Sequence, residues 1–455
     1  MAEAWVPDLA TAVGAKYQAI ADALSGAITR SELRTGDRLP PQRELAARLG
    51  VDLTTVTKAY DLVRRRGLIE ARGRAGSFVA EPGGAPAEVT DASLVDTGMN
   101  MPPEISGGLL AHTMSRTITA LLGVGTARLQ YQPSGGAPQD RAAGARLLRG
   151  VGLESSEEQV VVTAGGQNAL HAILGPGLEP GAVVACGRFV YPGFRALAAR
   201  LGLRLLALPE MRAEALAEAC RSARVKALYV VPTNDNPTAE TLPTEERAAI
   251  AAVAEREGLT IVEDDAYGLL AGGSIPPIAA FAPERSWHIA SLSKLLSPGL
   301  RVAYVRAPSV GGALRLAADV HETAIMAPPL NVAMATAWLA DGSFDRLVAA
   351  MRREVAERQA LAEAALGGVD YRRHPRGYHL WLPLPPGLAA AELVHAMQPE
   401  GLSLTAADRF AVTPGAEQAV RVSLGGPIAR ERLGRALRVL HGYLTAPAAR
   451  AAPIV

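Results

Sequence analysis

The first 80 residues change from helical to extended hydrophobic patterns. Apolar residues at helical spacing predict three helices, at residues 16–34, 41–49 and 54–66. Short extended stretches predict two strands, at residues 68–70 and 77–80. Pro41 suits the first turn of the second helix, and Gly50 and Gly67 end the second and third helices. Three helices followed by a hairpin predict a winged helix-turn-helix domain.

From about residue 94 the pattern changes to buried strands that alternate with helices. The predicted strands lie at residues 160–163, 182–185, 227–231, 260–263, 287–290 and 301–306. This alternation favours an α/β fold with a mostly parallel sheet. After about residue 341, a long helix, two strands and a final helix predict a smaller α+β domain. The strands and the final helix are expected at 378–384, 420–424 and 428–444.

A stretch rich in Pro, Gly and Ala, residues 80–86, separates the two patterns as a linker would. We therefore expect four parts along the chain. These are a winged helix-turn-helix domain at 1–80, a linker at 81–97, a large domain at 98–340 and a small domain at 341–455.

Composition places the chain among globular proteins: its 455 residues include 45 Gly and 32 Pro, and 20% of them are charged. Two cysteines cannot build a disulfide framework, and the N-terminus lacks the pattern of a secretory signal, so a cytoplasmic protein is expected. We expect no membrane span, because the longest uncharged stretches contain prolines and polar residues. The eight His and two Cys show no ligand spacing, so no metal site is expected.

Positive charge is concentrated near the N-terminus, although the whole chain carries only +1. Residues 37–80 hold nine Lys and Arg against five Asp and Glu, a modest electrostatic footprint for DNA. The stretch 36–78 (GDRLPPQRELAARLGVDLTTVTKAYDLVRRRGLIEARGRAGSFV) resembles the GntR family of DNA-binding domains. The third helix would then enter the major groove of double-stranded DNA. The expected DNA-binding residues are Arg43, Thr54, Thr55, Thr57, Lys58, Arg72 and Arg74. Composition alone would favour a small helical domain with a solvated basic face.

Lysine is rare in this chain. Only four of the 46 basic residues are lysines, at positions 16, 58, 226 and 294. An amine nucleophile must lose its proton, which a guanidinium does not do, so Arg cannot replace Lys in that role. Lys294 ends the motif SLSK after a predicted strand, with Arg301 seven residues later. A neutral amine can bond to an aldehyde cofactor, while nearby hydroxyls and a guanidinium hold its phosphate. The plain alternative is an exposed lysine in a loop.

Over about 350 residues the C-terminal block resembles the fold-type I aminotransferases, which depend on pyridoxal 5′-phosphate (PLP). The resemblance implies that Lys294 bonds covalently to PLP. It also implies that the phosphate is bound by Ser291, Ser293 and Arg301.

Two further motifs follow predicted strands. In EDDAY (263–267) the resemblance implies that Asp264 lies at the pyridine nitrogen, where an acid keeps the ring protonated, and that Tyr267 bonds the phenolic oxygen. In NPTA (236–239) it implies that Asn236 bonds the same oxygen, although Ala239 stands where the family has Gly. The alternatives are acidic residues that cap the next helix, which suits Asp265 better than Asp264, and a simple turn at NPT.

Three less specific signals add residues to the predicted cofactor site. Glycines between a strand and a helix let backbone N–H groups approach a phosphate, which makes candidates of Gly165, Gly166 and Gln167. Tyr191 resembles the aromatic residue that stacks on the cofactor ring, with Phe189 as the competing choice. Tyr131 resembles a tyrosine that reaches the phosphate of the neighbouring subunit, and a lone tyrosine is more often core or interface.

Arg421 matches the arginine that binds a substrate carboxylate through two bonds, although an arginine at the start of a strand is common. In their order, the two blocks resemble the MocR subfamily of GntR regulators. That resemblance implies a homodimer that binds DNA and senses PLP, or an amino compound bonded to it. Two alternatives remain: a working aminotransferase that has kept a DNA-binding domain, and a winged helix used only for protein contacts.

Overall fold

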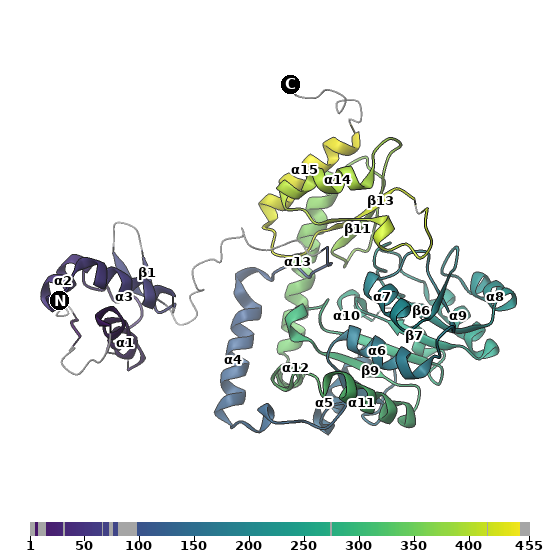
Figure 1. Ribbon diagram of the computed structural model, residues 1–455, viewed down its shortest axis with the longest axis horizontal. Helices are drawn as coiled ribbons and strands as arrows, with labels where there is room; N and C mark the ends of the chain where they lie inside the picture. The colour runs from purple at the N-terminus through teal and green to yellow at the C-terminus, as the bar shows by residue number, and fades with distance from the viewer. Residues whose placement is uncertain are drawn as a thin grey trace. The chain divides into compact units, whose positions relative to one another are not determined.

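The computed structural model describes residues 5–7, 15–30, 32–65, 67–71, 76–80, 98–273, 275–415 and 417–445 (Figure 1). The chain falls into two compact units, Met1–Val95 and Asp96–Val455. No described helix is long and apolar enough to cross a membrane.

The first unit is a winged helix-turn-helix. Its elements are α1 (Lys16–Thr29), α2 (Gln42–Leu49), α3 (Leu53–Arg65), β1 (Ile69–Ala71) and β2 (Ser77–Val79), and β1 pairs antiparallel with β2. The apolar face predicted for α1 is buried, since Ile20 and Leu24 pack with Val56 and Tyr60 of α3. Helix α1 ends five residues earlier than predicted.

The second unit contains a seven-stranded sheet with the order β3-β9-β8-β7-β6-β4-β5. The strands are β3 (Val160–Thr163), β4 (Val183–Cys186), β5 (Arg204–Ala207), β6 (Val225–Val230), β7 (Thr260–Asp264), β8 (Ser286–Ser291) and β9 (Ala303–Arg306). The pairs among β5, β4, β6, β7 and β8 are parallel, whereas β9 pairs antiparallel with both of its neighbours, β8 and β3. The predicted α/β fold with a mostly parallel sheet is confirmed. The edge strand β5 was missed, because its four residues (RLLA) are only partly buried and carry no strand pattern.

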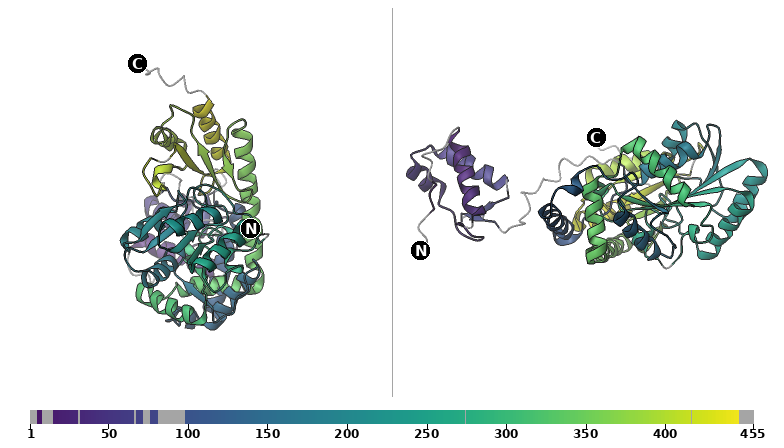
Figure 2. Two further views of the ribbon diagram at one scale, coloured as in Figure 1. Left: turned by 90° about the vertical axis from the view of Figure 1, so that its right-hand side faces the viewer. Right: turned by 90° about the horizontal axis from the view of Figure 1, so that it is seen from below.

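Helices cover both faces of this sheet (Figures 1 and 2). Side chains alternate along β6: Ala227 and Tyr229 pack with helices α6, α7 and α11, whereas Leu228 and Val230 pack with α8 and α9. The helices of this unit are α4 (Leu109–Gly123), α5 (Pro138–Arg149), α6 (Gly166–Gly177), α7 (Pro192–Arg200), α8 (Ala213–Ser222), α9 (Thr244–Glu257), α10 (Gly268–Ala271), α11 (Val310–Ala324), α12 (Pro329–Asp341), α13 (Ser343–Ala365), α14 (Ala390–Met397) and α15 (Arg430–Thr445). Burial on both faces explains why the strands of this sheet are rich in Val, Ile, Leu and Ala.

A smaller antiparallel sheet is formed by the strands that follow the long helix α13 in the chain (Figure 1). Its strands, in spatial order, are β10 (Arg372–Arg373), β11 (His379–Pro383), β13 (Ala419–Ser423) and β12 (Leu404–Ala406). Helices α13 and α15 pack against each other beside it. The expected smaller α+β domain is therefore present, with two short strands that the sequence pattern did not predict.

Glu354 of α13 joins three segments of this unit. It is 3% exposed, and its carboxylate accepts hydrogen bonds from Arg358 (2.7 Å), from Ser106 (2.8 Å) and from Arg430 at the start of α15. Burial raises the pKa of Glu354, but the bonds from Arg430, Arg358 and Ser106 outweigh it and lower the pKa to about 2.

Replacing Glu354 with Gln is therefore expected to lower the free energy of unfolding by about 3 kcal/mol at pH 7. The stabilisation exists only while the carboxylate is ionised, so the difference between wild type and variant shrinks as the pH falls from about 4.5 towards 2. Denaturant unfolding at several pH values measures it. The exposed Glu357→Gln change is the control, with an expected effect within about 0.5 kcal/mol. A difference for Glu354→Gln that is independent of pH would contradict this account.

Candidate functional site

The predicted cofactor residues come together at one edge of the large sheet. Strands β6, β7 and β8 are parallel and end at this edge, β9 is antiparallel to β8 and begins there, and β3 is antiparallel to β9 and ends there. The predicted residues follow or precede these strand ends: Gly165 and Gly166 after β3, Asn236 after β6, Asp264 and Tyr267 at and after β7, Ser291, Ser293 and Lys294 at and after β8, and Arg301 before β9. Sheet topology therefore gathers motifs that lie far apart in the sequence.

Lys294 is enclosed by charged neighbours. Its Nζ donates a hydrogen bond to the backbone oxygen of Asn100 (2.7 Å). Burial, and the positive charges of Arg421 and Arg301, lower the pKa of Lys294 to about 8, whereas Asp264 opposes the shift. The amine is therefore much closer to its neutral, nucleophilic form at neutral pH than an exposed lysine.

Asp264 is nine-tenths buried, and its Oδ2 accepts a hydrogen bond from the Tyr229 hydroxyl (3.0 Å). Burial raises the pKa of Asp264 to about 6, with a further contribution from Asp265, although the Tyr229 bond and Lys294 lower it. The ring of Tyr229 stacks on Phe194 with centroids 3.6 Å apart. Tyr229 thus holds the Asp264 carboxylate in position. This role could not be predicted from the sequence, where Tyr229 is one residue of an apolar strand.

The residues predicted for the phosphate form a small cradle. Arg301 has a left-handed backbone (φ 49°), and its guanidinium donates to the backbone oxygen of Ala164 (2.8 Å). A Cβ on Gly165 would lie 3.0 Å from that guanidinium, and a Cβ on Gly166 would lie 3.8 Å from the Cβ of Ser291. Only the Cβ on Gly165 would be too close, so glycine at position 165 keeps space open beside a cation and the first turn of α6, a donor set that suits a phosphate.

One buried hydroxyl also fits this interpretation. Within the part of the chain that the structure describes, the Oγ of Ser293 is buried without a hydrogen-bond partner. The Gln167 side chain instead donates to the backbone oxygen of Gly193 (3.2 Å), so it joins α6 to α7. Tyr131 is 83% exposed, which leaves its side chain accessible to a second subunit.

The two aromatic candidates for stacking occupy different surroundings. Burial and the charge of Asp264 raise the pKa of Tyr191, whereas Arg301 lowers it, so Tyr191 lies close to two of the predicted cofactor residues. The ring of Phe189 packs against Trp381 of β11, with centroids 5.0 Å apart. Phe189 therefore belongs to the contact with the small domain.

Arg421 lies in β13 and is 2% exposed. Its Nη1 donates to Oδ1 of Asn236 (2.9 Å), and its Nη2 donates to the backbone oxygen of Gly98 (2.7 Å) and to Thr405 (3.2 Å). The guanidinium also lies over the ring of Phe410, 5.1 Å from its centroid. Arg421 and Asn236 are thus neighbours across the two domains.

Asn100 is a central residue that sequence reasoning missed. It is 1% exposed; its Nδ2 donates to the hydroxyl of Tyr267 (2.9 Å) and lies 3.1 Å from Nδ1 of His379. Its Oδ1 accepts a hydrogen bond from Ser423 (2.9 Å). A single Asn in a loop gives no periodic signal, but a His inside the apolar strand YHLWL could have indicated a buried polar contact.

Ala239, which stands where a Gly was expected, has a left-handed backbone with φ of 58°. This conformation costs a non-glycine residue about 1–2 kcal/mol. Replacing Ala239 with Gly is therefore expected to leave the free energy of unfolding unchanged or to raise it by up to about 1 kcal/mol. The control is Ala360→Gly, at an exposed position of α13, which is expected to lose about 1 kcal/mol. Equal losses in both variants, measured by denaturant unfolding, would refute the strain at Ala239.

The predicted DNA-binding residues lie on the first unit. Three of them are exposed: Arg43, Thr54 and Lys58. Thr55 is half-buried, and the hydroxyl of Thr57 donates to Oε1 of Gln42 (2.8 Å), which joins α3 to α2. Arg72 and Arg74 lie outside the described residues.

Comparison with known proteins identifies both units. Residues 103–440 match the family Aminotransferase class I and II, and residues 16–79 match the bacterial regulatory proteins of the gntR family. The HTH-type transcriptional regulator YdeF of Bacillus subtilis (strain 168) is 29% identical over 97% of this chain and 96% of its own length. The HTH-type transcriptional regulator TauR of Rhodobacter capsulatus is 30% identical over 82% of this chain and 85% of its own length.

The second unit is also similar to a solved aminotransferase structure. LysN, an alpha-aminoadipate aminotransferase from Thermus thermophilus complexed with N-(5′-phosphopyridoxyl)-L-leucine, matches with a TM-score of 0.68 and 27% identity. The match covers 77% of this chain and 92% of that protein. The chain belongs to the aminotransferase class I and II family and, with its GntR domain, to the MocR-type transcriptional regulators, in which a DNA-binding winged helix precedes a fold-type I domain whose cofactor is pyridoxal 5′-phosphate.

Proposed function

We propose that this regulator senses PLP, or an amino carboxylate that bonds to PLP, and changes its DNA affinity in response. The observation that carries the proposal is the direct bonding of site residues to the segment that follows the predicted linker, 81–97. Arg421 donates to Gly98, and Tyr267 accepts a hydrogen bond from Asn100. Gly98 and Asn100 are among the first described residues after that linker, so a ligand at the site acts where the linker enters the domain.

The residues in the cradle fit the cofactor. PLP, when bound, supplies an electrophilic carbon for amines and a ring that accepts electrons. Lys294 would bond to it, Asp264 would hold a proton at the ring nitrogen, and Tyr191 would stack on the ring. The phosphate would be bound by Ser291, Ser293, Arg301, Gly165, Gly166 and Gln167, with Tyr131 from the partner subunit of a homodimer. Asn236 and Tyr267 would orient the phenolic oxygen.

Arg421 would bind the carboxylate of the effector. A guanidinium binds a carboxylate best through two parallel N–H bonds. Its Nη2 already donates to the Gly98 carbonyl, so a carboxylate competes with that contact. An effector shifts an equilibrium only by the difference in its affinity for two arrangements, and this competition supplies such a difference.

The winged helix would occupy residues 1–80, and a homodimer would present two of them to two half-sites. The PLP domain would extend over 98–340 and the small domain over 341–455. Lys58 is exposed on α3 and would contact phosphate.

Binding of the full-length protein to the DNA just upstream of its own gene tests the proposal. The titration is made with and without PLP and amino acids, over a salt series, with Lys294→Ala as the control. Selective binding that PLP shifts in the wild type but not in the variant supports it. Weak, non-selective binding that is indifferent to PLP, together with steady turnover of an amino acid and a 2-oxo acid, would favour the aminotransferase alternative instead.

Replacing Lys58 with Ala is expected to weaken DNA binding by a similar factor for every sequence. It should also reduce the slope of log affinity against log salt by about 2, because the proposed homodimer loses one phosphate contact in each of its two subunits. Lys16→Ala, on α1, is the matched control and should leave the slope unchanged. An unchanged slope for Lys58→Ala would exclude the phosphate contact.

A further inference from the structure

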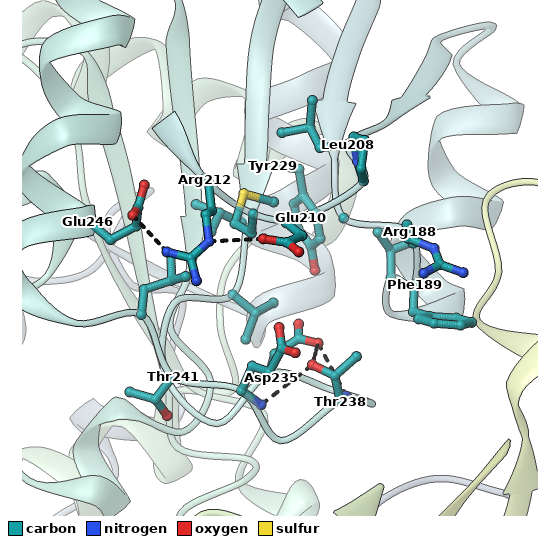
Figure 3. A pocket seen from close by; sticks show the side chains of 18 of the residues that line it. Arg188, Phe189, Leu208, Glu210, Arg212, Tyr229, Asp235, Thr238, Thr241 and Glu246 are labelled. Atoms are coloured by element: carbon teal, nitrogen blue, oxygen red, sulfur yellow. Dashed lines mark hydrogen bonds and ion pairs between the residues drawn. The ribbon is translucent and has the colours of Figure 1, made fainter. Parts of the chain in front are cut away.

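A second cavity, lined by none of the predicted cofactor residues, lies at the carboxyl ends of β4, β5 and β6 (Figure 3). Its volume is about 520 Å³, within the range of sites that enclose a small metabolite. Strands β4 and β6 are neighbours in the sheet, but β4 leads on to β5 on one side and β6 leads on to β7 on the other. In open α/β sheets, ligands bind in the crevice that forms where the chain changes direction in this way.

Acidic residues outnumber basic ones among the described residues that line this cavity. The charged lining residues are Glu210, Asp235, Glu240, Glu246 and Glu417, with Arg188, Arg212 and Arg372. Arg212 is shared between Glu210 (2.9 Å) and Glu246 (3.3 Å), as Figure 3 shows. One guanidinium thus serves two carboxylates, which leaves an excess of negative charge on this wall. A concave surface of one sign concentrates ligands of the other sign.

Asp235 lines this cavity and is partly buried. Its Oδ2 accepts hydrogen bonds from the hydroxyl (2.7 Å) and the backbone N–H (3.3 Å) of Thr238. Within the described part of the chain, no Lys, Arg or His side chain forms an ion pair with its carboxylate. Burial, with a smaller contribution from Glu240, raises the pKa of Asp235 to about 7, although the Thr238 bonds and Arg372 lower it. A cation in the cavity would supply the missing counter-charge.

The cavity also offers an apolar wall and a contact with the small domain. Leu208, Met211 and Leu242 line it, which suits a short aliphatic chain. Arg372 and Glu417 come from the small domain, whereas the remaining lining residues come from the large domain. A ligand held here would therefore touch both domains at once.

We infer that this cavity binds a small organic cation, an ammonium or guanidinium group on a short aliphatic chain, with the cationic group on Asp235. The site is separate from the cofactor cradle but adjoins it. Tyr229 lines the cavity, and its hydroxyl donates to Asp264. The backbone oxygen of Asp235 also lies 2.9 Å from Nε2 of His379, which contacts Asn100.

Calorimetric titration of the full-length, PLP-loaded protein with butylguanidine tests the inference. Butylurea, a neutral molecule of the same shape, is the matched ligand control. Neither ligand carries an aliphatic amine that could bond to the cofactor. Asp235→Asn removes the charge and keeps the shape, and Glu218→Gln, at an exposed position on α8 outside the cavity, is the matched control variant.

We expect one butylguanidine per chain, at least tenfold weaker binding by Asp235→Asn, unchanged binding by Glu218→Gln, and at least tenfold weaker binding of butylurea. If Asp235→Asn does not fold, Glu240→Gln is expected to weaken binding two- to fivefold. The inference would be overturned if butylguanidine did not bind at millimolar concentration or if butylurea bound equally well. It would also be overturned if Asp235→Asn, or Glu240→Gln in its place, bound butylguanidine as tightly as the wild type.

Discussion

Replacing Lys294 with Ala is expected to abolish the covalent attachment of PLP and, with it, the effect of PLP on DNA binding. The attachment needs a neutral amine, and burial together with Arg421 and Arg301 lowers the pKa of Lys294 to about 8. About a quarter of the molecules then carry a neutral amine at pH 7.5, against roughly one in a thousand for an ordinary lysine. Borohydride reduction followed by mass analysis of peptides should find the cofactor on Lys294 alone.

The same pKa predicts how the rate of attachment depends on pH. The rate should rise almost tenfold per unit up to about pH 7, about fivefold between pH 7 and 8, and level off above that, because the neutral fraction of Lys294 does so. Lys226, exposed on β6, provides the matched control: Lys226→Ala should attach PLP at the wild-type rate. Attachment of PLP to the Lys294→Ala protein at another lysine, with an intact response of DNA binding, would exclude Lys294 as the sensor residue.

The position of a polar side chain could be predicted from the sequence where that side chain lies near the end of a recognisable strand. Asp264, Ser291 and Asn236 lie at or within six residues of the ends of β7, β8 and β6, which are apolar enough to be recognised from their pattern. A parallel sheet brings such ends to one edge, so a linear list of motifs already describes a site. This is why the fold class could be predicted without coordinates, and why the residues that the family resemblance implies for the cofactor lie together in the structure.

Contacts made across the fold could not be predicted in this way. Asn100 acquires its importance from bonds to residues more than 160 positions away, and Tyr229 acquires its role from the hydroxyl at the end of a side chain in an apolar strand. The acidic cavity around Asp235 is another case, since its walls come from loops after three strands and from the small domain. Periodicity reports burial along one element, and it carries no information about which distant groups meet.

Replacing Arg421 with Met is expected to remove the recognition of effector carboxylates and to leave the recognition of amines. Truncating one partner of a buried, charged pair typically costs about 2–5 kcal/mol, so the amino acid concentration that half-saturates the site should rise by about 100-fold. An amine of the same chain that lacks the carboxylate should bind with nearly unchanged affinity. The cofactor's absorbance, followed during titration with each ligand, measures both affinities.

The comparison of two ligands separates recognition from structural damage. Loss of Arg421 also leaves Oδ1 of Asn236 and the oxygen of Gly98 without their donor, and structural damage of this kind would act on both ligands alike, whereas a lost carboxylate contact acts on the amino acid alone. Arg247→Met is the matched control, because Arg247 is fully buried and bonded to the backbone oxygens of Leu242 and Pro232, whereas Arg421 bonds to Asn236, Gly98 and Thr405. It should lower stability and keep the wild-type ratio of amino acid to amine affinity. If Arg421→Met also keeps that ratio, the carboxylate is bound elsewhere, and the competition with the Gly98 carbonyl cannot be the link between effector and DNA.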